Sequence, residues 1–288
     1  MAPEAKRPRQ GDGGRGEPSK RPARSATSSA PAGPRTAYTP MFERFRDHMD
    51  AQQDRRERVV KASRDITALS KKMVRRIHPD LPADVDREVQ SRLAEISRLL
   101  ASIAPELQGI HRGRYGRVLF GMEELIEALT FAYYLRTQSL LSLEDAQAQV
   151  AQLCRHGHAA EAAKAAAPVQ PNAHIPVIGP DGNDYIMGVF DLSGEMMRFA
   201  TTTAALRGEL ASDGSQSGRT IVGDMQELGS FFEMLPQRHD KSWKTKMQVM
   251  QTSVQKVERL GYDLRVRGSE RPKGWVPDAT EIEPQSPV

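Results

Sequence analysis

Hydrophobic residues recur at intervals of three and four along most of this chain, which is the pattern of amphipathic helices. Helices are predicted over about 40–77, 83–103, 105–137, 142–155, 184–211, 219–235 and 239–266. No run of alternating β-branched residues competes with this pattern. The predicted fold class is therefore all-α, a single seven-helix bundle.

Three segments lie outside the helical pattern. Residues 1–37 are rich in Pro, Gly, Ser and Arg without apolar periodicity, so we expect a disordered tail there. Residues 156–183 combine Ala, Pro, Gly, Asn and His, and predict an internal loop. Residues 269–288 are polar and predict a C-terminal tail, which leaves one helical domain over 38–268.

The positive charge of the chain is concentrated at its N-terminus. The 288 residues carry a net charge of +4. Residues 1–36 hold eight of the 41 Lys and Arg and three of the 37 Asp and Glu, which leaves 33 basic against 34 acidic residues elsewhere. A nearly neutral body can bind a polyanion only through a local patch, a metal ion or the charge of a partner.

Two basic clusters in the tail have the spacing of a bipartite nuclear import signal. Lys6 and Arg7 are followed twelve residues later by the cluster of Lys20, Arg21 and Arg24. The alternative is a generic basic tail that contacts nucleic acid weakly. The first interpretation predicts a nuclear as well as a cytoplasmic location.

Several classes of protein are disfavoured by the composition. No apolar run approaches the roughly 20 residues that a membrane helix needs, and the N-terminus lacks the apolar core of a secretory signal. The single cysteine, Cys154, excludes an internal disulfide and a cysteine-based zinc cluster. We expect an intracellular protein without a membrane partner.

Two pairs of acidic residues are the candidates for chemistry. Glu124 and Glu127 are separated by about 60° around one predicted helix, and Asp191 and Glu195 by about 40° around another. Two such pairs on facing helices would offer four carboxylates, the hard oxygen ligands that Mg²⁺ or Mn²⁺ prefers.

The same spacing also occurs on ordinary solvated helix faces. All four acids lie off the apolar stripes of their helices, so spacing alone favours a solvated face over a metal site. Gly188 and Gly194 interrupt the second helix, where each costs about 1 kcal/mol relative to Ala. Glycines in such positions are easier to understand if another backbone or a ligand approaches closely.

Several stretches in register resemble the translin superfamily. They are KASRDIT (61–67), GMEELIEALTF (121–131), RTQSLLS (136–142), DYIMGVFDLSGEMMR (184–198) and YDLRVRGSERPK (262–273). They occur in the order of the family and span most of the predicted helical domain. The acidic residues resemble those of the subunit type that associates with translin.

This resemblance implies a function and a partner. It implies assembly with translin into a closed, octameric hetero-oligomeric shell (C3PO) that acts as a Mg²⁺-dependent endoribonuclease, with Mn²⁺ as an alternative ion. The substrate would be single-stranded or short RNA, with single-stranded DNA as a further ligand. The resemblance carries the catalytic and metal-binding roles to Glu124, Glu127, Asp191 and Glu195.

The resemblance leaves three neighbouring residues as weaker candidates. Glu123 stands where the family usually has Gln, and it adds a carboxylate that is a further candidate metal ligand. Arg117, two turns before Glu124 on the predicted helix, and Arg198, one turn past Glu195, are candidate contacts for RNA phosphates. Surface arginines, or partners of the acids, explain them equally well.

Three functional hypotheses follow. The first is a metal-dependent endoribonuclease subunit that is active only in the complex. The second is a non-catalytic scaffold that binds nucleic acid and stabilises translin, for which no Mg²⁺-dependent turnover is expected. The third is a solitary helical interaction module in the nucleus, which a mass measurement with and without a translin-type partner would separate from the other two.

Overall fold

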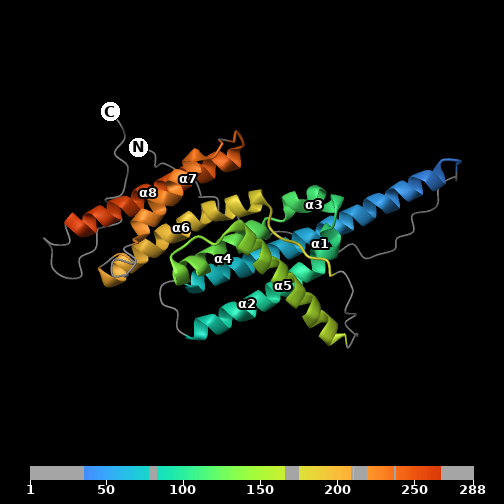
Figure 1. Ribbon diagram of the computed structural model, residues 1–288. Coiled ribbons are helices and arrows are strands. Elements are labelled where there is room, and N and C mark those ends of the chain that lie inside the picture. The colour runs from blue at the N-terminus through green and yellow to red at the C-terminus, as the bar shows by residue number, and fades with distance from the viewer. Residues whose placement is uncertain are drawn as a thin grey trace, which may run out of the picture. The chain divides into compact units, whose positions relative to one another are not determined.

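The computed structural model describes residues 36–77, 83–165, 175–208, 210, 219–236 and 238–266. These residues form eight α-helices and two short 3₁₀ turns, without any strand (Figure 1). The helices are α1 (Thr39–Ile77), α2 (Ala83–Ile103), α3 (Ile110–Tyr115), α4 (Gly121–Thr137), α5 (Leu143–Lys164), α6 (Gly182–Arg207), α7 (Ile221–Met234) and α8 (Lys241–Val266). The all-α prediction is confirmed, and α1 and α2 begin and end within one residue of the predicted bounds.

The chain divides into two units, Met1–His48 and Met49–Val288. In the first unit, the described part of α1 leaves Met41, Phe42 and Phe45 exposed. The second unit holds the hydrophobic core and all the helices after α1. Among the described helices, none combines the length and the apolar character that crossing a membrane requires.

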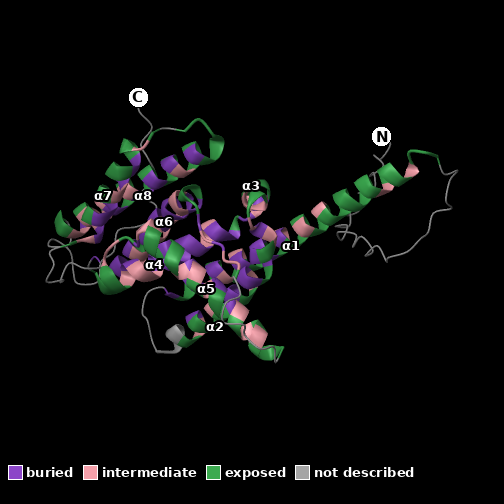
Figure 2. Cartoon of the chain, turned by 45° about the vertical axis from the view of Figure 1, so that its right-hand side comes forward, coloured by how far each residue is buried: buried purple, intermediate pink, exposed green. Residues whose placement is uncertain are grey.

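Helix α4 provides the centre of the core of the second unit. Leu125, Ile126 and Phe131 are fully buried, and burial extends around most sides of the helix (Figure 2). This explains why the sequence shows no wide polar face over α4, as expected for a helix surrounded by others. Any charged residue on α4 must therefore find a partner or a polar pocket.

Gly188 allows α6 to cross α4 at close range (Figure 1). A Cβ added at Gly188 would lie 2.7 Å from the carbonyl oxygen of Glu123 and 2.8 Å from the Cβ of Ile126. The expectation that a backbone approaches Gly188 is confirmed. Gly194 lines a pocket instead, and no described atom from another segment lies within 4 Å of a Cβ built there.

The start of α6 is fixed by a reciprocal capping box. The backbone N–H of Asp184 donates to Oδ1 of Asp181 at 2.8 Å, and the N–H of Asp181 donates to Oδ2 of Asp184 at 3.1 Å. Arg112 of α3 also donates to Asp184, at 2.6 Å. Because Asp191 follows Asp184 by two helical turns, this cap sets the register of the acids on α6.

The single helix predicted over 105–137 is wrong, and this raises the number of helices from seven to eight. The structure divides the segment into a 3₁₀ turn at Ala104–Leu107, α3, a second 3₁₀ turn at Gly116–Val118, and α4. Pro105 lacks a backbone N–H for helix continuation, and Gly109 adopts a positive φ of 55°.

The predicted loop over 156–183 is also partly wrong, because α5 continues to Lys164 and α6 begins at Gly182. The alanines after His158 favour a helix. Gly157 is not a loop residue: a Cβ there would lie 1.9 Å from the carbonyl oxygen of Ser97, so it permits close packing of α5 on α2. The predicted tails lie almost wholly outside the described residues.

Candidate active site

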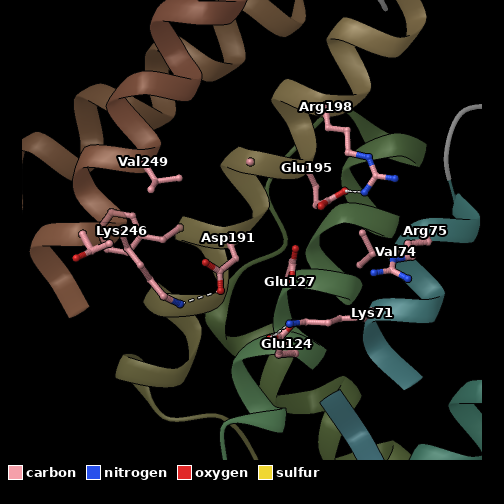
Figure 3. Close-up of a pocket in the computed structure, with 13 residues that line it drawn as sticks. Lys71, Val74, Arg75, Glu124, Glu127, Asp191, Glu195, Arg198, Lys246 and Val249 are labelled. Carbon is pink, nitrogen blue, oxygen red and sulfur yellow. Dashed lines mark hydrogen bonds and ion pairs between the residues drawn. The ribbon is translucent and has the colours of Figure 1, made fainter. Parts of the chain in front are cut away.

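Helices α1, α4, α6 and α8 line a pocket of about 490 Å³ in the second unit (Figure 3). All four predicted acids line it: Glu124 and Glu127 from α4, and Asp191 and Glu195 from α6. Basic side chains surround the acids, namely Lys71, Arg75, Arg198 and Lys246. The structure therefore brings the two predicted pairs together in one pocket.

Glu127 lies deepest of the four acids. It is 9% exposed, and no described Lys or Arg forms an ion pair with it. Burial, followed by the nearby charges of Asp191, Glu124 and Glu195, raises the pKa of Glu127 to about 8. The Glu127 carboxyl thus holds a proton at neutral pH.

The other α4 acid, Glu124, is paired with a lysine of α1. Nζ of Lys71 lies 2.9 Å from Oε1 of Glu124, and the lysine side chain is 54% exposed. This interaction raises the pKa of Lys71. Only the lysine of this pair is exposed, since the Glu124 side chain is 19% exposed, and the lysine can exchange its acceptor for water.

The two α6 acids also have basic partners. Nζ of Lys246 lies 2.8 Å from Oδ2 of Asp191, and Nη1 of Arg198 lies 3.4 Å from Oε2 of Glu195. Burial raises the pKa of Asp191, although Lys246 acts in the opposite direction. The three more accessible acids therefore each have a basic partner, and burial favours the neutral form of the fourth.

Glu123 has a different environment from the four acids. It is not among the described residues that line the pocket, and its Oε2 lies 3.0 Å from Nζ of Lys246. Burial raises the pKa of Glu123. Its role as a candidate metal ligand stays a prediction, but its observed partner is a lysine.

Aromatic packing places Lys246 beside α6. Phe190 of α6 stacks on Phe232 of α7 with ring centroids 4.0 Å apart, and it meets Trp243 of α8 edge to face at 5.0 Å. Lys246 follows Trp243 by three residues, so it lies on nearly the same side of α8. The lysine side chain then reaches over to the polar side of α6.

The two candidate phosphate contacts are separated by the structure. Arg198 lines the pocket, as expected of a residue one turn past Glu195. Arg117 is exposed on a 3₁₀ turn and is not among the residues that line the pocket. The predicted placement of Arg117 on the same helix as Glu124 is wrong, because the chain breaks before α4. The predicted import signal, Lys6 to Arg24, lies outside the described residues.

The four carboxylates are suitable ligands for a hard divalent ion, but they are not arranged in a coordination geometry. Four carboxylates offer the oxygen ligands of Mg²⁺, and their mutual repulsion would be relieved by a cation. Within the described ranges, however, no three His, Cys, Asp or Glu side chains are positioned to hold a metal ion. Binding would require Glu124 and Glu195 to turn from their basic partners and Glu127 to lose its proton.

Sequence reasoning missed the two lysines of the pocket. Lys71 and Lys246 come from helices far apart in the chain, and no local spacing connects them to the acids. The only signal for Lys246 is its place between Trp243 and Met250, beside the apolar stripe of its helix. Long-range packing, rather than sequence pattern, brings these charges to the acids.

The structure thus defines an all-helical protein with a four-carboxylate pocket between its helices. The translin family model matches residues 54–268, and the chain belongs to the translin family. The resemblance found in the sequence is confirmed.

Curated relatives cover most of the chain. It is 29% identical over 249 residues to translin-associated protein X of Mus musculus, across 84% of this chain and 83% of the mouse protein. The Rattus norvegicus protein of the same name is 29% identical over 271 residues, across 91% of this chain and 88% of the rat protein. A translin-associated protein X homolog of Schizosaccharomyces pombe is 27% identical over 238 residues, across 80% of this chain and 89% of the yeast protein.

Proposed function

We propose that this chain is the catalytic subunit of a Mg²⁺-dependent endoribonuclease that it forms with a translin-type partner. The observation that carries the proposal is the convergence of Glu124, Glu127, Asp191 and Glu195 on one pocket. Similarity to proteins named as translin-associated supports the partner. We further propose a closed octameric shell, activity only in the complex, and both nuclear and cytoplasmic location.

The four pocket carboxylates would hold Mg²⁺, or Mn²⁺ in its place. When bound, the ion supplies Lewis-acid activation of water and offsets the charge that develops on the scissile phosphate. In the metal-free pocket the pKa of Glu127 is about 8, so its ligation of the ion would release a proton. Without an ion, Glu195 pairs with Arg198 and Asp191 pairs with Lys246.

The charges at the pocket favour a phosphodiester substrate. Lys71 and Arg198 are about half exposed, so both can turn toward phosphate oxygens once the acids have another cation. A nearly neutral body then contacts RNA through this local patch and through the partner. Single-stranded or short RNA is the proposed substrate, with single-stranded DNA as a further ligand.

The test uses Glu124→Gln and Asp191→Asn in the complex reconstituted with the translin-type partner. Both variants should assemble normally, and RNA cleavage should fall at least 100-fold. Wild-type cleavage should require Mg²⁺ and stop with EDTA. Full cleavage by either assembled variant would remove the catalytic assignment.

One observation favours a second candidate, a non-catalytic scaffold that binds nucleic acid and stabilises translin. Three of the four acids already have basic partners, as purely structural acids would. The scaffold predicts assembly and RNA binding without any Mg²⁺-dependent turnover. The same EDTA experiment separates the two proposals.

A further inference from the structure

Lys246 is held at three points between α4 and α6, of which Figure 3 shows the contact with Asp191. Its Nζ donates to Oδ2 of Asp191 at 2.8 Å, to Oε2 of Glu123 at 3.0 Å and to the carbonyl oxygen of Met187 at 3.0 Å. An ammonium group has three N–H donors, so each donor has an acceptor. Two carboxylates and one carbonyl form the kind of oxygen environment that binds a small cation.

The two lysines of the pocket differ in how firmly they are held. The side chain of Lys246 is 20% exposed and has three acceptors, whereas that of Lys71 is 54% exposed and is paired with Glu124 alone. An incoming ion can therefore displace Lys71 with little loss. Displacing Lys246 would leave the half-buried carboxylates of Glu123 and Asp191 without their cation, which is costly.

The hydrogen bonds of Lys246 require its charged form. Its Nζ donates to three oxygen acceptors, and only the protonated ammonium group has three N–H donors. The lysine is thus a cation beside one of the four pocket acids. A second divalent ion next to Asp191 would meet this positive charge at close range.

We propose that Lys246 is a resident cation of the acidic pocket, anchored by Glu123, and that the pocket therefore binds one divalent ion rather than two. The inference rests on the proposed metal site. Lys246 already donates to Oδ2 of Asp191, so a divalent ion would be held by the other carboxylates that line the pocket. Glu123 then serves as a positioning residue for Lys246 and is not a metal ligand.

The test counts bound metal ions without RNA. The full-length chain, in complex with its translin-type partner, is titrated with Mn²⁺ and followed by electron paramagnetic resonance, and the partner alone provides the background. Wild type should bind one Mn²⁺ per chain. Lys246→Met should bind a second ion, because it frees oxygens of Asp191, Glu123 and Met187.

Lys244 provides the matched control. It lies on the same helix, is exposed, and Lys244→Met removes an equal charge. This control should still bind one ion per chain. If Lys246→Met does not assemble, Lys246→Gln replaces it, since a polar head can keep one hydrogen bond in the same space.

Two bound ions in wild type, or a single ion in the assembled Lys246 variant, would overturn the inference. The outcomes also separate it from the proposed function. Two bound ions with intact RNA cleavage would reject the proposed role of Lys246 and keep the proposed nuclease function. One bound ion without RNA cleavage would reject the nuclease function and keep the role of Lys246. No bound ion in wild type would reject both proposals.

Discussion

Nζ of Lys71 lies 2.9 Å from Oε1 of Glu124, so α1, the longest of the described helices, supplies a cation to an acid of α4. The lysine occupies a carboxylate that the proposed metal ion needs. Lys71 and a metal ion must therefore compete for Glu124, so breaking this ion pair should favour metal binding.

Replacing Lys71 by Met should tighten metal binding. We expect the Kd for Mn²⁺ to fall about three- to tenfold, because one competitor of the ion is removed. The free energy of unfolding without metal should change by less than about 1 kcal/mol, as for most exposed ion pairs. Calorimetric titration measures the first quantity and urea denaturation the second.

Lys72→Met is the control for charge alone, since Lys72 is exposed on the same helix and does not line the pocket. Equal tightening by both variants would mean that net charge, rather than the contact with Glu124, sets the affinity.

Glu127 should make the metal-free protein less stable as the pH rises. Its folded-state pKa of about 8 lies above the ordinary value of 4.5, so between these pH values the folded protein keeps a proton that the unfolded chain has lost. The free energy of unfolding therefore falls across this window, by on the order of 3 kcal/mol. Glu127→Gln should remove most of this fall.

Urea denaturation at pH 5.5 and 8.0, with EDTA present, measures this effect. Glu195→Gln is the comparison: it should reduce the fall only in part, because the charge of Glu195 is one of the smaller causes that raise the pKa of Glu127. An unchanged pH dependence in Glu127→Gln would show that other groups cause it.

The helical periodicity was sufficient to predict the fold class and most helices, because each amphipathic stripe is a local property of the chain. It failed where local signals conflict with packing. Gly157 indicated a loop, yet it lets α5 pack on the backbone of α2, and Gly109 ended a helix that apolar spacing alone would continue. Such outcomes depend on contacts between segments far apart in the sequence.

The acids of the site were predictable, but their environment was not. Spacing paired Glu124 with Glu127 and Asp191 with Glu195, and the resemblance to the translin superfamily joined the two pairs. Burial of Glu127 on a helix surrounded by others, and the arrival of Lys246 from α8, follow only from the packed structure.

Gly188 and Gly194 should respond in opposite ways to the same substitution. Gly188→Ala places a Cβ 2.7 Å from the carbonyl oxygen of Glu123, which requires α4 and α6 to separate. We expect a loss of about 1–3 kcal/mol, as for other overpacked cores. Gly194→Ala meets open space and should gain about 0.5–1 kcal/mol from helix propensity.

Thermal or chemical denaturation measures the change in the free energy of unfolding for each of the two variants. A stable Gly188→Ala protein would contradict the close crossing of α4 and α6. Because Gly194 lines the pocket, its variant also reports whether a small group there hinders metal binding.

Arg198 and Arg117 should differ in their effect on RNA cleavage, if the proposed nuclease is correct. Arg198 lines the pocket 3.4 Å from Glu195, whereas Arg117 is exposed on a turn that does not contribute to the lining. Arg198→Gln should lower kcat/KM about tenfold or more, because it removes a phosphate contact at the pocket. Arg117→Gln should stay within twofold of wild type. Single-turnover cleavage by the assembled complex at fixed salt measures both, and equal losses would indicate a general electrostatic effect instead of a contact at the pocket.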